Sequence, residues 1–394
     1  MTPIQKFEKP LGMRDSFPLI NEKKEKVREI GRTFFRSRGF DFIKTPTVEY
    51  YETIGKASAI TDSSLFKLVD RQGETLVLRP DMTTPIVRVA TSKLLKEQIP
   101  LRLAYFANVF RAQENEGGRP AEFEQMGVEL IGDASVYADA EMIITASEFV
   151  EALGIDDYQL TVGHAGLLQS ILMELTNSNG QVKELRQFLV EKNLVGFEEV
   201  IRTYELPNEV EAHLIEFINQ ASNLHSTEQL SSFIDEKNES QVQMFSYLKK
   251  LSILLENAGL SNLVAYDLTL TSEMSYYTGM LFEVFANGSG FALGNGGRYD
   301  GLLEEFNSTV GATGFGLRVD RLLEVIKPFT QRESHTLIYF DDVHYVEAVE
   351  AAKELRKQGI RTTIQLISSV EDQPSFQTNF SNVEWLIEGV GNNE

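Results

Sequence analysis

Cysteine is absent from this sequence of 394 residues, which excludes disulfide bonds, thiolate catalysis and cysteine–zinc sites together. Histidine occurs only five times and is scattered along the chain, so we expect no metal site. The N-terminal segment lacks an apolar signal core, and no apolar run approaches the length needed to cross a bilayer. We therefore expect a cytoplasmic protein that holds no metal and does not enter a membrane.

The sequence also lacks a basic cluster. Its 37 Lys and Arg residues stand against 58 Asp and Glu residues, and the formal net charge is −21. From Gln331 onward there are 5 basic and 11 acidic residues, a net charge of −6. Proteins that bind RNA rely on Lys and Arg to neutralise phosphates, so we expect no nucleic-acid partner.

The stretch Phe106–Gly132 carries the clearest pattern in the chain. Ala104–Phe110 and Phe123–Ile131 are predicted strands. The loop between them, Gln113–Glu122, is charged and contains glycine, which is typical of an exposed hairpin tip. The sequence therefore predicts a β-hairpin at this point.

Polar residues follow one face of the second predicted strand. Its alternation places Gln125, Gly127 and Glu129 on the same side, and Arg111 follows the first strand. A guanidinium pairs with a carboxylate, and a carboxylate pairs with an ammonium or imidazolium group. These side chains could therefore converge on one small charged ligand. A structural alternative is that Arg111 and Glu129 pair with each other across the sheet.

The order Phe-Arg, a loop, and Phe-x-Gln-x-Gly-x-Glu resembles motif 2 of class II aminoacyl-tRNA synthetases, in the form typical of histidyl-tRNA synthetases. It is formed here by Phe110, Arg111, Phe123, Gln125, Gly127 and Glu129. The resemblance implies that Arg111 lies near the carboxylate of a bound amino acid. The helix expected at Leu19–Arg38, with the proline-containing strand after it, resembles motif 1, the dimerisation element. Gly314–Arg321 resembles motif 3, whose last arginine contacts ATP.

The resemblance implies an α+β fold, with a class II synthetase-like antiparallel sheet flanked by helices. Residues 1–165 and 260–328 would form this core as one discontinuous domain. Residues 166–259 have a polar, helical pattern and are the expected helical insertion, which histidyl-tRNA synthetases also carry. Residues 332–394 alternate strand and helix, which predicts a small, truncated α/β domain at the C-terminus.

The segment Arg79–Thr83 is similar to an Arg-Pro-Glu-x-Thr segment that binds the substrate's ammonium group in histidyl-tRNA synthetases. Asp81 and Thr83 match the ligand positions, although aspartate is one methylene shorter than the family's glutamate. With Gln125, they would surround the ammonium group. A structural alternative is that Asp81 and Thr83 cap a helix beginning near Pro85, because both residue types are common caps.

Two histidine-specific signatures of the family are also matched. The first, Arg-Gly-Leu-Asp-Tyr-Tyr, aligns with Ser272–Tyr277, which keeps Tyr276 and Tyr277. The second, Gly-Gly-Arg-Tyr-Asp, is present and includes Gly297. The resemblance implies that Tyr277 faces the imidazole together with Glu129, while Tyr276 and Gly297 shape the walls.

The nucleotide side of the pocket departs from the family. Ser272 replaces the arginine that helps to activate the substrate carboxylate. Gln113 replaces the glutamate that reads adenine, and Ala121 aligns with the arginine that clamps the ATP phosphates. Removing one donor that stabilises developing charge typically lowers a rate by about 10²–10³. We therefore expect no catalytic residue and no cofactor.

This combination resembles the regulatory subunits of ATP phosphoribosyltransferase, which are paralogues of histidyl-tRNA synthetase in bacterial histidine biosynthesis. The resemblance implies a non-catalytic chain that binds L-histidine and confers feedback inhibition on a short-form catalytic subunit. A homodimer within a hetero-oligomer is the expected assembly. The alternatives are a histidyl-tRNA synthetase with a degenerate tail and a histidine-binding module for another partner.

Overall fold

The computed structural model describes residues 6–58, 60–112, 120–176, 178–272, 274, 276–327 and 335–388. Gln113 lies outside the described residues, as do most of the expected hairpin tip and, within Ser272–Tyr277, Glu273 and Ser275. The chain forms two compact units, Met1–Lys327 and Pro328–Glu394.

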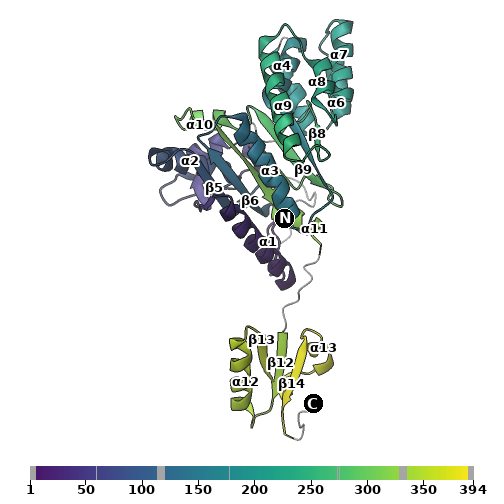
Figure 1. The fold of residues 1–394 in the computed structure, drawn as a ribbon. Coiled ribbons are helices and arrows are strands. Elements are labelled where there is room, and N and C mark those ends of the chain that lie inside the picture. The colour runs from purple at the N-terminus through teal and green to yellow at the C-terminus, as the bar shows by residue number, and fades with distance from the viewer. Residues whose placement is uncertain are drawn as a thin grey trace. The chain divides into compact units, whose positions relative to one another are not determined.

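An eight-stranded sheet forms the centre of the first unit (Figure 1). Its strand order is β1-β5-β6-β11-β10-β9-β7-β8, and its neighbours are antiparallel except for β1–β5 and β7–β8. In chain order the strands are β1 (Asp41–Phe42), β5 (Leu101–Phe110), β6 (Glu122–Ile131), β7 (Tyr158–His164), β8 (Val264–Tyr266), β9 (Met280–Ala286), β10 (Gly294–Arg298) and β11 (Ala312–Arg318). This mostly antiparallel sheet, flanked by helices, confirms the predicted α+β class.

The predicted hairpin is the pair β5 and β6. Strand β5 starts at Leu101, earlier than expected, because Leu101 and Leu103 extend the buried side of the strand. The pairing runs from Leu101 opposite Ile131 to Phe110 opposite Glu122. The hairpin therefore supplies the second and third strands of the sheet, next to the edge strand β1.

Helices cover both faces of this sheet. Helices α1, α3 and α11 pack over one face, where the ring of Phe35 lies 4.8 Å from that of Phe149 and 6.2 Å from that of Phe315. Helices α2 and α10 cover the other face. The helices of the first unit outside β7–β8 are α1 (Pro18–Ser37), α2 (Thr83–Ser92), α3 (Val136–Ala152), α10 (Asp300–Glu305) and α11 (Val319–Val325).

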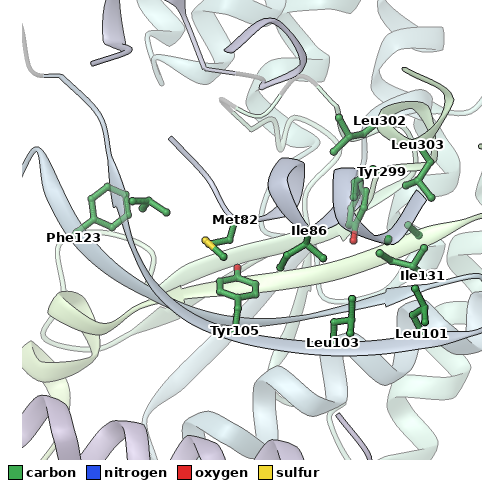
Figure 2. Close-up of a cluster of buried hydrophobic side chains, with 14 residues drawn as sticks. Met82, Ile86, Leu101, Leu103, Tyr105, Phe123, Ile131, Tyr299, Leu302 and Leu303 are labelled. Carbon is green, nitrogen blue, oxygen red and sulfur yellow. The ribbon is translucent and has the colours of Figure 1, made fainter. Parts of the chain in front are cut away.

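The face below α2 and α10 carries a buried cluster that also borders the site described below. Figure 2 shows Leu101, Leu103 and Tyr105 in a row along one strand, with Met82 and Ile86 above them. Each of these side chains is at most 7 % exposed. This packing fixes the position of the first turn of α2 over the sheet.

A smaller sheet and a helical segment complete the first unit. The antiparallel sheet has the order β2-β4-β3, with β2 (Val48–Tyr50), β3 (Lys67–Val69) and β4 (Thr75–Leu78). The last two strands form a hairpin, and Gly73 in its turn has a positive φ of +90°, which glycine adopts readily.

Between β7 and β8, the regular secondary structure of the described residues is helical (Figure 1). Its core includes Leu168, Leu172, Leu248 and Leu251, which are fully buried. That this segment is an insertion with its own domain boundaries stays a prediction. Its helices are α4 (Ala165–Thr176), α5 (Asn179–Val190), α6 (Leu194–Arg202), α7 (Asn208–Gln220), α8 (Thr227–Leu230) and α9 (Glu239–Asn257).

The second unit is a three-stranded parallel sheet of order β13-β12-β14. Ala348 and Ala352 of its long helix pack against Ile338 of the central strand. Its elements are β12 (His335–Phe340), α12 (Tyr345–Lys357), β13 (Arg361–Leu366), α13 (Gln373–Gln377) and β14 (Asn382–Leu386). Within the described ranges of the whole chain, no helix is both long and apolar enough to span a membrane.

Candidate functional site

The site lies on the sheet face below α2, where glycines face long polar side chains. On β6, Gln125 and Glu129 lie two places either side of Gly127, so all three share this face, as the alternation predicted. Strand β11 places Gly314 opposite Glu129 and Gly316 opposite Gly127. A Cβ on Gly314 would stand 2.0 Å from Glu129 Oε2, and one on Gly316 would stand 2.1 Å from Gln125 Nε2. The two polar side chains can lie across the sheet only because these positions lack a Cβ.

Above this glycine floor is a small polar pocket. Six of the eight residues predicted to bind the ligand line it, and Arg111 and Gly297 are outside its lining. The lining residues are Asp81, Thr83, Tyr105, Gln125, Glu129, Met274, Tyr276, Tyr277, Asn295, Tyr299, Gly314, Phe315 and Gly316.

Glu129 is held rigidly at the bottom of the pocket. It is 1 % exposed. The Thr83 hydroxyl donates to Oε1 at 2.8 Å, and the Tyr299 hydroxyl donates to Oε2 at 2.5 Å. Burial raises the pKa of Glu129 to about 8, against the two hydrogen bonds that lower it, and nearby Asp81 raises it further. A cationic group entering the pocket would find a carboxyl group that becomes far more acidic once it is paired.

Gln125 presents an unused acceptor to the pocket. Its Oε1 atom is buried and has no hydrogen-bond partner among the described residues. A buried carbonyl oxygen without a donor is costly, because it has lost its water. Gln125 is therefore suited to accept a hydrogen bond from a ligand.

Asp81 and Thr83 turn out to have different roles. Asp81 Oδ1 accepts from the Thr84 backbone N–H at 2.7 Å and Oδ2 accepts from the Thr84 hydroxyl at 3.1 Å, so Asp81 does bind the first turn of α2. Thr83 instead donates to Glu129. The helix-capping alternative thus holds for Asp81, although a carboxylate retains further lone pairs for a ligand. Burial raises the pKa of Asp81.

Three aromatic residues form one wall. The ring of Tyr276 lies edge-on to those of Tyr277 and Tyr299, at 5.1 Å and 5.9 Å between centroids. The Tyr277 hydroxyl accepts from Asn295 Nδ2 at 3.3 Å. Gly297 lies just behind this wall, since a Cβ there would stand 2.9 Å from the Tyr277 ring. It shapes the pocket by letting Tyr277 approach the sheet.

Arg111 lies beyond the end of β5, at the edge of the pocket. Its Nε donates to the Pro80 carbonyl at 3.1 Å, and its positive charge lowers the pKa of Asp81 against the larger effect of burial. Because Leu103 is the residue opposite Glu129 on β5, Arg111 is too far along the strand to pair directly with Glu129. The cross-strand alternative is therefore wrong.

Sequence reasoning missed several lining residues. Tyr299 was visible as the tyrosine of the Gly-Gly-Arg-Tyr-Asp signature, and Gly314 and Gly316 lie within the motif 3 resemblance. Tyr105 and Asn295 carried no motif role. Their place in the pocket follows from strand pairing, because Tyr105 is opposite Gly127 and Asn295 is opposite Gly316.

The described residues that align with the family's ATP-side contacts are engaged in contacts within this chain. Ala121 is fully buried, its N–H donates to the Gly12 carbonyl at 2.8 Å, and a Cβ on Gly12 would lie 2.6 Å from the Ala121 Cβ. An arginine at this position would have no space. Ser272 accepts from the Met274 backbone N–H at 3.1 Å. Arg321 donates to the backbone carbonyl of Ala292.

Two polar residues outside the pocket are structural. Arg298 of β10 is 7 % exposed and pairs with the fully buried Asp139 at 2.9 Å. His164 Nδ1 accepts from the Leu167 N–H at 3.1 Å at the start of α4. Burial lowers the pKa of His164 to about 4. In the described part of the chain, no group of three or more His, Asp or Glu side chains is placed to hold a metal ion.

The chain matches the family model for histidyl-tRNA synthetase over residues 12–322. Residues 337–388 match a second model, "Histidyl-tRNA synthetase HisZ, C-terminal domain". The second unit is therefore similar to the C-terminal domain that this second model describes.

Close relatives match over nearly the full chain. The ATP phosphoribosyltransferase regulatory subunit of Lysinibacillus sphaericus is 56% identical, with 96% of this chain and 97% of that protein covered. The regulatory subunit of Bacillus subtilis is 42% identical, with 97% of each covered.

Solved structures agree with the sequence matches. A crystal structure described as an ATP phosphoribosyltransferase regulatory subunit/histidyl-tRNA synthetase from Bacillus halodurans has a TM-score of 0.89 at 39% identity, covering 98% of this chain and 100% of the other. Histidyl-tRNA synthetase from Nostoc has a TM-score of 0.76 at 19% identity, covering 95% of this chain and 89% of the other, and shares the fold. The chain therefore belongs to the family of ATP phosphoribosyltransferase regulatory subunits, which is built on the histidyl-tRNA synthetase fold.

Proposed function

We propose that this chain binds free L-histidine and passes its occupancy to an ATP phosphoribosyltransferase catalytic subunit, which it inhibits as part of histidine biosynthesis. The observation that carries the proposal is the buried Glu129 carboxyl group, which two hydroxyl donors hold over a glycine floor beside the unpartnered Gln125 oxygen. The names of the relatives support the regulatory part.

Glu129 selects the imidazole side chain. A carboxylate opposite imidazole favours the imidazolium form, and Tyr277 faces the same ring. An apolar amino acid of similar size would leave the buried Glu129 without a partner, which is a strong basis for rejection. Tyr276 and Gly297 shape the walls around the ring.

The backbone groups of the ligand lie toward α2 and the end of β5. Gln125 Oε1 and the remaining lone pairs of Asp81 accept hydrogen bonds from the ammonium group, with Thr83 beside them. Arg111 provides the positive charge for the carboxylate. This orientation uses each predicted residue once and leaves the imidazole at Glu129.

The chain binds this ligand without transforming it. Ser272 and Ala121 lack the cationic side chains that adenylate formation requires, and Gln113 removes a contact to adenine. Pyrophosphate exchange with histidine and ATP should stay at background. Ser272→Arg alone should not restore it, because the nucleotide side is altered at more than one position. Robust histidine-dependent exchange would favour the histidyl-tRNA synthetase alternative.

A homodimer is the proposed building block of the assembly. The row Tyr50, Leu76 and Leu68 crosses the β2-β4-β3 sheet, and Tyr50 and Leu68 are 53 % and 44 % exposed. Exposed apolar rows of this kind mark interaction surfaces, and a symmetric pair buries the same patch twice.

The proposal is tested by reconstitution. The purified chain is mixed with a short ATP phosphoribosyltransferase that has no regulatory domain, separated by size exclusion, and assayed with and without histidine. We expect an active hetero-oligomer that histidine inhibits. Separate elution, with histidine sensitivity that does not depend on this chain, would refute the assignment and favour another partner.

Glu129→Ala separates binding from assembly. The change removes one buried partner of the ligand and should weaken histidine binding by about 1–3 kcal/mol. Assembly and basal activity should persist, while inhibition is relieved. Glu354→Ala is the matched control, since the Glu354 side chain is 62 % exposed and lies in the second unit.

A further inference from the structure

The sheet face that carries the pocket continues past Gln125 to an aromatic residue. Phe123 lies two places before Gln125 on β6 and therefore on the same face. It is opposite Val109 on β5 and is 6 % exposed. Figure 2 shows Phe123 at one end of the row of side chains that includes Tyr105. A flat aromatic surface thus adjoins the amino-acid pocket.

Arg318 covers this surface. It is the residue opposite Gln125 on β11, and its guanidinium carbon lies 3.7 Å from the centre of the Phe123 ring. Its Nε and Nη2 donate to the two carboxylate oxygens of Asp320 at 3.2 Å and 2.7 Å. The Arg318 side chain is 14 % exposed. The stacked position is therefore held by a two-point ion pair and by burial.

A guanidinium in this position competes with a planar ligand. The group is flat and delocalised, and it stacks on aromatic faces as a nucleobase does. Arg111 lies further from the same ring, at 5.5 Å. Arg318 is thus the residue that occupies the stacking distance over Phe123.

Arg318 is poorly arranged for an alternative task, the binding of a phosphate. Its charge is compensated by Asp320, and two of its donor groups are already engaged in the bidentate pair. An arginine that binds phosphate needs this fork for the ligand. The contacts fit a filler of the aromatic surface better than an anion site.

We propose that Arg318 is a specificity-determining residue that fills the stacking surface on Phe123 and so excludes planar nucleobases from the space beside the amino-acid pocket. The exclusion is built into the chain by a side chain stacked in place. It concerns nucleobases alone, so it stands or falls independently of histidine binding.

Adenosine is the probe, because it carries a base and no charge. We expect Arg318→Ala to bind adenosine at least about tenfold more tightly than the parent chain, in equilibrium dialysis, since stacking on one exposed ring is worth about that much. Arg38→Ala is the matched control. Arg38 also stacks on an aromatic ring, 3.5 Å from the centre of Phe34, and pairs with Glu148, so its removal exposes a ring away from the pocket.

The direction of the change in adenosine affinity shows whether Arg318 fills the aromatic surface or has another role, such as binding a phosphate. Unchanged or weaker adenosine binding in a folded Arg318→Ala chain would overturn the proposal, as would an equal gain in Arg38→Ala. Ribose 5-phosphate binding that is present in the parent chain and lost in the variant would identify a phosphate site instead. Thermal unfolding checks that the variant is folded. If it is not, Asp320→Asn loosens Arg318 and should give a smaller gain in adenosine binding, and no gain there would refute the proposal.

Discussion

The two ends of one sheet face are built in opposite ways. At the open end, where we propose that the amino acid binds, Gly314 and Gly316 leave space into which Glu129 and Gln125 extend. At the other end, which we call the closed end, Arg318 covers Phe123. Space for a ligand therefore depends on where the strands omit a Cβ and on which neighbouring segment fills the rest.

The same two ends differ in their electrostatics. The open end holds the buried carboxyl groups of Asp81 and Glu129, whose pKa values are raised by burial. At the other end, the charge of Arg318 is already compensated by Asp320. One end favours the entry of a cation, whereas the other end offers little to an anion.

The largest expected effect is on stability, and it comes from inserting a long charged side chain at the closed end. Ala121→Arg would place a long cation in a fully buried position against Gly12, so we expect the free energy of unfolding to fall by about 3 kcal/mol. Urea titration of both chains measures the change. Ala258→Arg, at an exposed position after α9, should change stability little. Equal stability of Ala121→Arg and the parent would show that this end is not closed.

The next effect comes from filling the open end. A Cβ at Gly316 would stand 2.1 Å from Gln125 Nε2 and 2.7 Å from the hydroxyl of the buried Tyr105, so the end of the Gln125 side chain must move. We expect Gly316→Ala to fold and to bind histidine about 10–100-fold more weakly, the scale of overpacking by one methyl group. Gly290→Ala is the control, because a Cβ there meets nothing within 4 Å. Unchanged histidine affinity in Gly316→Ala would contradict the assigned floor.

The sequence predicted this open end well, for physical reasons that are local. Alternation alone placed Gln125, Gly127 and Glu129 on one face, because a strand has a fixed period of two residues. It could not show Tyr299 reaching Glu129 from a separate strand end. Nor could it show that Asp81 binds the first turn of α2 while Thr83 turns to the pocket, since both residue types suit either role.

The packing at the closed end is harder to predict from the sequence. The sequence shows that Ala121 stands where the family has an arginine, but the burial of Ala121 depends on Gly12, which is distant in sequence and has a φ of +76°. The stacking of Arg318 depends on the register of β11 against β6. Pairings between distant segments leave no periodic signal in either one.

The number of protons released when histidine binds tests the raised pKa of Glu129 at the open end. In the free protein the pKa of Glu129 is about 8, whereas imidazole titrates near about 6.5. At pH 5.5 the carboxyl group is protonated and the ligand is already imidazolium, so forming the ion pair releases up to about one proton. At pH 7.2 the proton passes from Glu129 to imidazole, and the net exchange is close to zero.

Calorimetry in two buffers of different ionisation enthalpy measures this exchange. Affinity should rise between about pH 5 and 6.5, because release is favoured as protons become scarce, and then level off below about pH 8. Glu129→Gln should abolish the release at pH 5.5. Release of the same size in that variant would assign the proton to another group.

The smallest expected effect is on the clamp that holds Glu129. Tyr299→Phe removes the donor to Oε2 and leaves Thr83 in place. We expect histidine binding to weaken by about 0.5–1.5 kcal/mol, the net value of one hydrogen bond. Tyr339→Phe, in the second unit, is a matched control. A loss as large as that of Glu129→Ala would mean that Tyr299 itself contacts the ligand.

The contrast between the two ends is tested most directly by calorimetric titration of the purified chain with L-histidine and, separately, with ATP. We expect saturable heat with histidine, which would bind at the open end, and none with ATP, because Arg318 fills the closed end. Saturable binding of ATP, together with no heat and no thermal stabilisation by histidine, would contradict the account.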